Sequence, residues 1–175
     1  MRIASLLLVA TSLTMLPPPT AMAAKPGDLS FELASNLPIA LGQYVLSERA
    51  LDPYELAAPL NPFYLQGDLN GDGRSDFAIW IREVASGKRG LLILHGGTRE
   101  SFVLAAGKAF DTSRDNFSAF NSWYIFPKGK VTQSAFSEKP PPELLGDALL
   151  LAVLEASDGL IYWTGSRYSW YQQGD

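Results

Sequence analysis

Three apolar segments in the first half of the chain predict neighbouring β-strands. Residues 77–82 read F-A-I-W-I-R, and this alternation with a period of two is typical of a strand with one well-buried face. The short apolar segment Phe63–Leu65 precedes it, and the unbroken run Leu91–Leu94, typical of a central strand, follows a turn at Ser86–Lys88. Because the connections are short, we expect these strands to form an antiparallel meander.

The C-terminal residues 160–171 carry the pattern of a β-hairpin. Their apolar and aromatic side chains flank Thr164-Gly165, where we expect a type I turn with the glycine in the left-handed conformation, because threonine is unfavourable at positive φ. That turn pairs Leu160 with Tyr168. It predicts one core-facing aromatic surface, formed by Leu160, Tyr162, Tyr168 and Trp170.

Other segments are less regular but complete the expected fold. The apolar run Ala148–Leu154 predicts a strand, and Ser157–Gly159 is expected to turn the chain after it. A short helix or strand is expected around Leu41–Arg49, and the aromatic spacing in Thr112–Trp123 favours one or two helical turns. Lys139–Pro142 reads as an extended surface linker.

These patterns predict a single mainly β domain, a β-rich α+β fold. We expect antiparallel meander and hairpin sheets with one or two short helices. No internal repeat is visible in the sequence, and the chain is too short to form a complete β-propeller, which needs several blades.

The first 23 residues have the features of a cleaved secretory signal peptide. Arg2 is followed by the mostly apolar run Ile3–Leu16 and by the small residues of Ala21–Ala23 that a signal peptidase recognises. A retained membrane anchor is the alternative. We expect an exported domain over residues 24–175, periplasmic or extracellular, without stable membrane insertion once the signal is removed.

Charge and cysteine content narrow the class of protein further. The chain has 14 Lys and Arg residues against 18 Asp and Glu residues, a net charge of −4, and signal cleavage would remove one more positive charge. This balance argues against nucleic acid or an anionic membrane surface as partner, because both require clustered basic residues. The chain has no cysteine, so it must fold without disulfides.

The segment Gly67–Ile79, G-D-L-N-G-D-G-R-S-D-F-A-I, contains the most specific chemistry in the chain. Oxygen-bearing side chains occupy the first, third, fifth and ninth positions of one tight loop over residues 68–76, and two glycines supply unusual backbone angles. Side chains packed this closely repel each other unless a cation lies among them, and Ca²⁺ accepts many oxygen ligands in flexible geometry. A calcium-free acidic turn is the alternative.

The spacing of this loop distinguishes it from an EF-hand. An EF-hand requires a glutamate at the twelfth position, which here is Ile79. The pattern D-x-N-x-D-G-x-x-D resembles the calcium loops of FG-GAP and VCBS repeats, which join two strands of a blade. The resemblance covers one unit, from Phe63 to about Gly97. It implies calcium ligation by the side chains of Asp68, Asn70, Asp72 and Asp76 and by the backbone carbonyl of Arg74.

The sequence offers no recognisable catalytic motif. His95 is the single histidine, no G-x-S-x-G turn is present, and a zinc site needs several His or Cys ligands, so we interpret His95 as a structural residue. The acidic residues outside the loop single out no catalytic pair by their spacing: Asp111, Asp115, Glu143, Asp147, Glu155 and Asp158.

We therefore expect a non-catalytic exported calcium-binding domain that binds a protein or a glycan at the cell envelope. Its C-terminal run, from Gly146 onward, resembles that of small exported bacterial proteins, a likeness that carries no activity. Trp163 and Tyr171 fall outside the predicted core face and are the aromatic candidates for an exposed contact, although packing in the core or at an edge is favoured. The alternative is a hydrolase of envelope polymers that uses the scattered carboxylates.

Overall fold

A computed structural model describes residues 29–47, 51–111, 114–135 and 137–174. The predicted signal peptide, residues 1–23, lies outside the described residues. Two short helices come first, α1 (Leu29–Ser35) and α2 (Ile39–Ser47). The strands follow in two groups: β1 (Tyr54–Leu56), β2 (Tyr64–Gly67), β3 (Asp76–Glu83), β4 (Arg89–Leu94) and β5 (Ser101–Ala105), then β6 (Ser122–Phe126), β7 (Ala148–Val153), β8 (Ser157–Trp163) and β9 (Tyr168–Gly174).

The strands form two antiparallel sheets, as the apolar segments predict. In the first sheet β3 pairs with β4 and β4 with β5, while β1 and β2 both pair with β3 on its other side. The second sheet is a meander in the order β6-β7-β8-β9. The fold is mainly β, and the described residues form neither a closed barrel nor a propeller.

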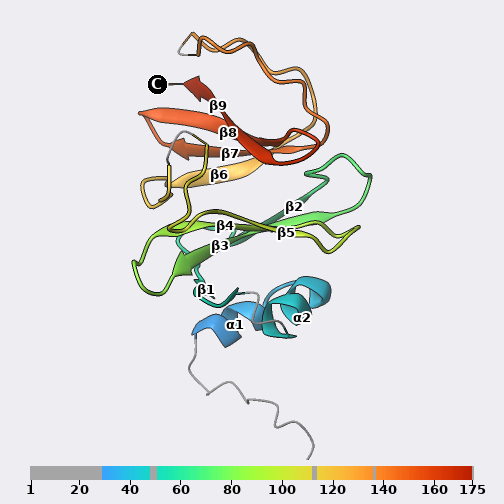
Figure 1. The fold of residues 1–175 in the computed structure, drawn as a ribbon, viewed down its shortest axis with the longest axis vertical. Helices are drawn as coiled ribbons and strands as arrows, with labels where there is room; N and C mark the ends of the chain where they lie inside the picture. The colour runs from blue at the N-terminus through green and yellow to red at the C-terminus, as the bar shows by residue number, and fades with distance from the viewer. Residues whose placement is uncertain (1–28, 48–50, 112–113, 136, 175) are drawn as a thin grey trace, which may run out of the picture.

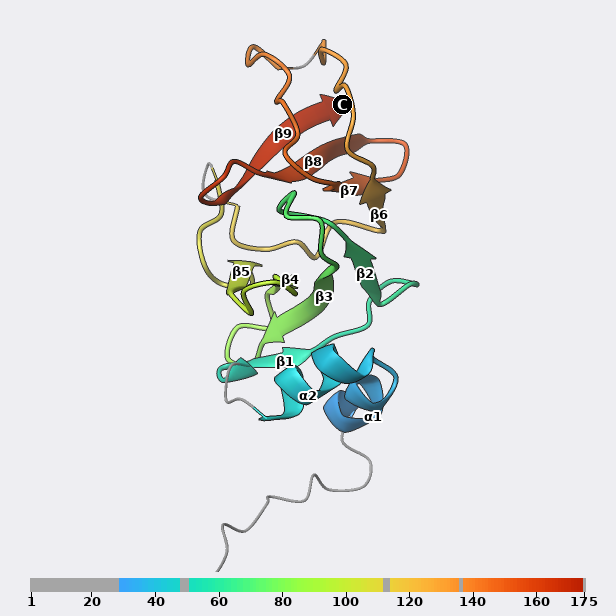
Figure 2. The same ribbon diagram turned by 90° about the vertical axis from the view of Figure 1, so that its right-hand side faces the viewer.

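The molecule is built in layers, with the two sheets stacked on each other (Figure 1). Their facing sides form one core that contains Trp80 and Leu91 from the first sheet and Leu151 and Ile161 from the second. Figure 2, turned by 90°, shows the same stacking from the side. Burial of these large side chains between the sheets is the main source of stability in such an arrangement.

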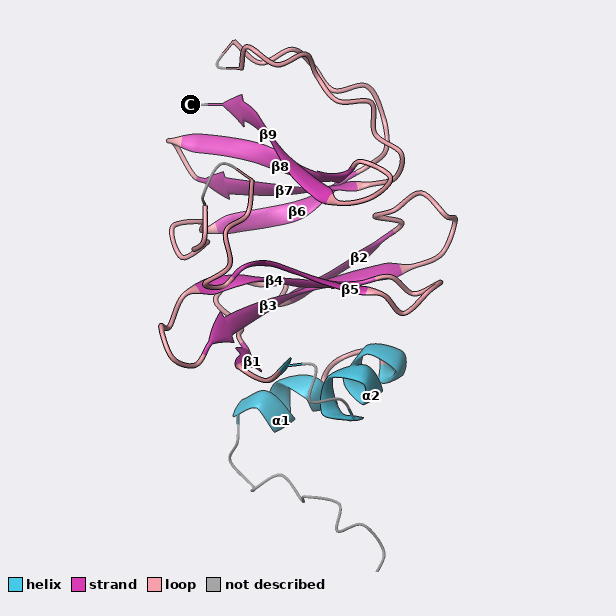
Figure 3. Cartoon of the chain, viewed as in Figure 1, coloured by secondary structure: helices cyan, strands magenta, loops and turns pink. Residues whose placement is uncertain are grey.

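Each outer face of the stack has its own cover. Helices α1 and α2 lie against the outer face of the first sheet (Figure 3), where Leu41 and Val45 of α2 pack with Ile79 and Ile81 of β3. The long β6–β7 connection, residues 127–147, covers the outer face of the second sheet with Val131 and Leu144 among its buried side chains. Apolar side chains therefore pack in three successive layers.

Strand β3 is more deeply buried than its sequence pattern predicts. All six residues from Asp76 to Ile81 are buried, because Ala78 and Trp80 face the second sheet while Phe77, Ile79 and Ile81 face the helices. The expectation of one buried face is wrong, since alternation here separates two cores rather than core from solvent.

The C-terminal hairpin also differs from the prediction. Leu160 pairs with Tyr171 rather than Tyr168, and Trp163 pairs with Tyr168 across a turn of Thr164–Arg167. The longer turn shifts the register, so Ile161, Tyr168 and Trp170 face the first sheet while Leu160 and Tyr171 face the β6–β7 connection. The prediction of a single core face is therefore wrong: both faces are buried.

Two further local predictions are wrong. Ser157–Gly159 belongs to β8, and the chain turns at residues 154–156 instead. No helix forms in the described part of Thr112–Trp123, residues 114–123, where Phe110 bridges to Arg114 and Phe117 packs into the inter-sheet core. The aromatic residues spaced by three, Phe117, Phe120 and Trp123, lie in irregular chain or at a strand and pack at the inter-sheet core.

The two sheets share one arrangement that the sequence analysis did not reveal. In each sheet a strand leads through a loop to an aspartate at the start of the next strand: Asp76 begins β3, and Asp147 directly precedes β7. The second and fourth residues after each aspartate face the inter-sheet core. Both aspartates accept hydrogen bonds from the backbone at the start of their loop, at Leu69 and Lys128 respectively.

Candidate metal centre

The predicted calcium loop connects β2 to β3, the strand-flanked position that the sequence indicates. Gly71 and Gly73 adopt φ values of 82° and 79°, in the left-handed region that side chains with a Cβ disfavour. Gln66 and Ser75 join the two strand ends by a side-chain hydrogen bond of 3.0 Å. The loop is therefore a tight turn with a defined conformation.

Backbone amides of the loop surround the Asp68 carboxylate. Its Oδ1 accepts a hydrogen bond from Gly71 N–H (2.8 Å), and its Oδ2 accepts one from Gly73 N–H (3.0 Å). The two glycines thus allow the backbone to curl around one carboxylate. Each of these oxygens retains a lone pair that the hydrogen bond does not use.

Asn70 and Asp72 are linked to each other on the outer side of the loop. Asp72 N–H donates to Asn70 Oδ1 at 3.0 Å, and Asn70 Nδ2 donates to Asp72 Oδ2 at 3.2 Å. Asp72 Oδ1 also accepts from Arg74 N–H at 2.8 Å. These short-range turns are the usual conformations of Asn and Asp in loops, and they hold the side-chain oxygens close to the backbone.

Asp76 is the one fully buried acidic side chain among the described residues. Its Oδ2 accepts hydrogen bonds from the N–H groups of Leu69 (2.9 Å) and Asn70 (3.1 Å). Its Oδ1 accepts a third from Gly96 N–H (2.9 Å), beyond the end of β4. Burial raises the pKa of the Asp76 carboxyl, while these bonds and nearby His95 act in the opposite direction. Asp76 therefore anchors both the start of the loop and the neighbouring turn.

The loop also touches the second sheet directly. Asp147 N–H donates to the Asp68 carbonyl oxygen (2.6 Å), and Asp68 N–H donates to Asp147 Oδ2 (3.1 Å). Glycines allow this approach: a Cβ on Gly71 would lie 2.2 Å from the Leu145 carbonyl oxygen, and one on Gly146 would lie 2.2 Å from the Asp68 carbonyl oxygen. No feature of the sequence pairs residues 68 and 147.

The donor chemistry of the loop fits a hard cation such as Ca²⁺. Asp68, Asn70, Asp72 and the Arg74 carbonyl offer only oxygen atoms, within a loop that presses so closely on the β4–β5 turn that a Cβ on Gly97 would lie 2.5 Å from Asp72 Oδ2. Across the residues that the structure describes, no three His, Cys, Asp or Glu side chains form a group that could hold a metal ion.

His95 is a buried, hydrogen-bonded residue, as the sequence analysis expects. Its Nε2 lies 2.7 Å from the Tyr168 hydroxyl oxygen, so the residue after β4 and the first residue of β9 form a polar contact inside the core. Its ring also packs against Phe102 and Trp163. Burial raises the pKa of the Tyr168 hydroxyl. Tyr168 as the partner of His95 is a contact that sequence reasoning missed, because it joins residues far apart in the chain.

We expect Tyr168→Phe to lower the free energy of unfolding by about 1–2 kcal/mol, because the His95 nitrogen loses its partner in a buried site. Urea denaturation of the variant measures this loss. Tyr124→Phe is the matched control, since Tyr124 is half exposed and its change should stay within about 0.5 kcal/mol. Equal losses in both variants would contradict the importance of the buried contact.

The two aromatic residues considered for an exposed contact are both packed. Tyr171 is buried, and its hydroxyl oxygen accepts a hydrogen bond from Ser134 N–H at 3.1 Å. Trp163 is half-buried and lies edge-on to His95 and Phe102. Packing at a core or an edge, the favoured interpretation, is therefore confirmed for both side chains. The shifted hairpin register places Trp163 beside Tyr168, and the β6–β7 connection covers Tyr171.

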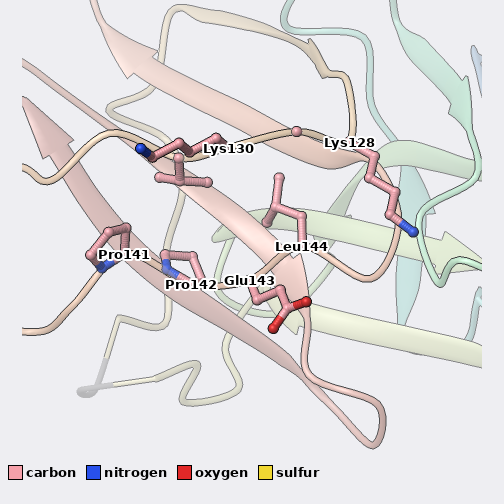
Figure 4. A pocket seen from close by; sticks show the side chains of 8 residues that line it. Lys128, Lys130, Pro141, Pro142, Glu143 and Leu144 are labelled. Carbon is pink, nitrogen blue, oxygen red and sulfur yellow. The ribbon is translucent and has the colours of Figure 1, made fainter.

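A groove lies between the two arms of the β6–β7 connection (Figure 4). It has a volume of about 420 Å³ and is lined by residues 128–131 and 141–144. Its floor is apolar, with Val131 and Leu144 buried. In Figure 4 the ammonium groups of Lys128 and Lys130 point in opposite directions at its rim.

The carboxylates considered for hydrolysis are spread over several parts of the structure. Asp115 pairs with Lys88, Asp147 accepts a hydrogen bond from Asp68 N–H, and Glu143 lines the groove. Asp158 lies in β8, where its Oδ1 has no hydrogen-bond partner.

Comparison with protein-family models, curated proteins and solved structures finds no match for this chain. Neither of the helices in the described ranges is long and apolar enough to span a membrane.

Proposed function

We propose that this protein is a non-catalytic, exported calcium-binding domain in which the ion stabilises the junction of the two sheets. The observation that carries this proposal is the conformation of residues 68–76. The loop folds around the Asp68 carboxylate with Asn70 and Asp72 beside it. The atoms that these groups can offer to a metal ion are oxygen atoms.

In this proposal the side chains of Asp68, Asn70 and Asp72 and the carbonyl of Arg74 hold the ion. Asp76, which the loop spacing also predicts as a ligand, is engaged by three backbone N–H groups, and in this proposal its role is to anchor the loop. A bound divalent cation supplies positive charge that offsets the repulsion among these carboxylates. Because it binds only the folded loop, it favours the folded state.

Thermal unfolding with calcium and with a chelator tests the proposal. At a calcium concentration 100-fold above the dissociation constant, binding adds about 2.7 kcal/mol of stability. For a domain of this size, that corresponds to a rise in Tm of about 5–10 °C. Magnesium at the same concentration should have a smaller effect, because it requires a more rigid octahedral site.

The Asp72→Ala variant provides the control for this experiment. It removes an exposed ligand, so we expect it to abolish the calcium-dependent rise in Tm with little change in the chelated protein. Equal midpoints in calcium and chelator for the unchanged protein, together with no binding heat in calorimetry, would refute the calcium proposal.

We also propose that the groove in the β6–β7 connection contacts a protein or glycan partner at the cell envelope. Its apolar floor and two prolines give it shape, and its two lysines outweigh Glu143, so the lining carries a net positive charge on an otherwise acidic chain. Capture of envelope components by the purified protein, compared with a Lys128→Glu/Lys130→Glu variant, tests this role. Identical captured material from both proteins would contradict a role for the groove.

A further inference from the structure

Asp147, which directly precedes β7 of the second sheet, forms two hydrogen bonds with the first residue of the predicted calcium loop. Its N–H donates to the Asp68 carbonyl oxygen at 2.6 Å, and its Oδ2 accepts from Asp68 N–H at 3.1 Å. Its other oxygen, Oδ1, accepts from Lys128 N–H at 2.9 Å. The Asp147 carboxylate, at the end of the β6–β7 connection, therefore accepts hydrogen bonds from the main chain of Asp68 and from Lys128 near the start of that connection.

The neighbouring backbone leaves this contact little freedom. A Cβ on Gly146 would lie 2.5 Å from Gly71 N as well as 2.2 Å from the Asp68 carbonyl oxygen. A Cβ on Gly67 would lie 2.8 Å from Asp147 Oδ2. Because backbone meets backbone here, movement of residues 145–147 must move the beginning of the loop.

We propose that Asp147 is a positioning residue for the calcium loop, so that calcium binding and the docking of the two sheets are coupled. The inference rests on the calcium-binding function proposed above. Asp147 acts through Asp68: it fixes the main chain from which that carboxylate extends, and the carboxylate is itself oriented by Gly71 and Gly73.

The physical basis is the cost of orienting a ligand. A metal ligand that is already held in place loses less freedom on binding, and removal of such a supporting hydrogen bond typically weakens metal affinity about 10- to 100-fold. The coupling is reciprocal: if docking of the second sheet favours calcium binding, calcium must favour docking by the same factor.

Titration calorimetry of the purified protein with CaCl₂, well below the unfolding temperature, measures the effect. We expect Asp147→Asn to weaken calcium affinity about 10-fold, because an amide nitrogen replaces one of the two accepting oxygens. Asp147→Glu keeps the charge but moves the carboxylate, and it should weaken affinity similarly. Glu138→Gln, which removes the same charge from the same connection at an exposed site outside the groove, should leave the affinity within about twofold.

The outcomes separate the two proposals. No calcium binding by the unchanged protein would refute the calcium function and this inference with it. Calcium binding that Asp147→Asn leaves unaltered would overturn the positioning role alone. Full affinity in Asp147→Glu would also overturn it, since charge rather than geometry would then be responsible.

Amide hydrogen exchange on the unchanged protein gives a second readout that needs no variant to fold. Calcium should slow exchange at the amides of Lys128 and Asp147 in the β6–β7 connection as well as within residues 68–76. If Asp147 only stabilised the fold, calcium binding at residues 68–76 would not change amide exchange in the β6–β7 connection. Protection confined to the loop would contradict the coupling.

Discussion

Asp76→Ala is expected to lower the free energy of unfolding by about 3 kcal/mol or more in calcium-free buffer. The substitution leaves the N–H groups of Leu69, Asn70 and Gly96 without their acceptor, and each donor that stays buried costs roughly 1–3 kcal/mol. Relief from burying the carboxylate offsets part of this cost. Chemical denaturation in the presence of a chelator measures the change without any contribution from bound metal.

Asp72→Ala in the same buffer is the matched control for this effect. It makes the same chemical change four residues earlier, but Asp72 is exposed and bonds only within the loop. We expect a loss of less than about 1 kcal/mol. If both variants lost equal stability, the anchoring role of Asp76 would be wrong.

Gly71→Ala is expected to be nearly as damaging, by more than about 3 kcal/mol. The left-handed backbone conformation alone costs an alanine roughly 1–2 kcal/mol. In addition, the new Cβ would lie 2.2 Å from the Leu145 carbonyl oxygen and 2.7 Å from its carbonyl carbon, so the loop would have to move away from the β6–β7 connection. The melting temperature and the midpoint of denaturation should both fall.

Gly73→Ala is the control that separates the conformational cost from the contact of Gly71 with Leu145. Gly73 has nearly the same φ as Gly71, but a Cβ placed on it meets no atom within 4 Å. Its loss should therefore be only the conformational cost of about 1–2 kcal/mol. A difference of less than about 0.5 kcal/mol between the two variants would show that the close approach to Leu145 has little importance.

Much of the strand content could be predicted from the sequence. The apolar runs at 77–82, 91–94 and 148–154 correspond to β3, β4 and β7, because a buried strand needs an unbroken or alternating apolar sequence. The loop position was also predictable, since its glycines and acidic residues are local signals. The metal ligands are still a prediction. The spacing of the residues indicates which groups could bind a cation, but it does not fix where their oxygen atoms lie.

The contacts that connect the two sheets were beyond sequence reasoning. Nothing local indicates that Asp147 bonds to Asp68 or that Tyr168 meets His95, because these pairs are brought together only by stacking. The hairpin error has a similar cause. A four-residue turn and a tighter turn differ by a small local preference, yet the difference places Tyr168 and Trp170 on the same face as Ile161 instead of Leu160.

The covers on the two outer sheet faces have a consequence for assembly. A sheet with an exposed apolar face can accept another sheet on top of it, and stacked repeats continue until a polar or occupied surface ends the series. Here Ile79 and Ile81 are already in contact with α2, and Leu160 and Tyr171 are already under the β6–β7 connection. The helices and that connection therefore leave neither outer face open to a further sheet, and the stack in the described residues ends at two sheets.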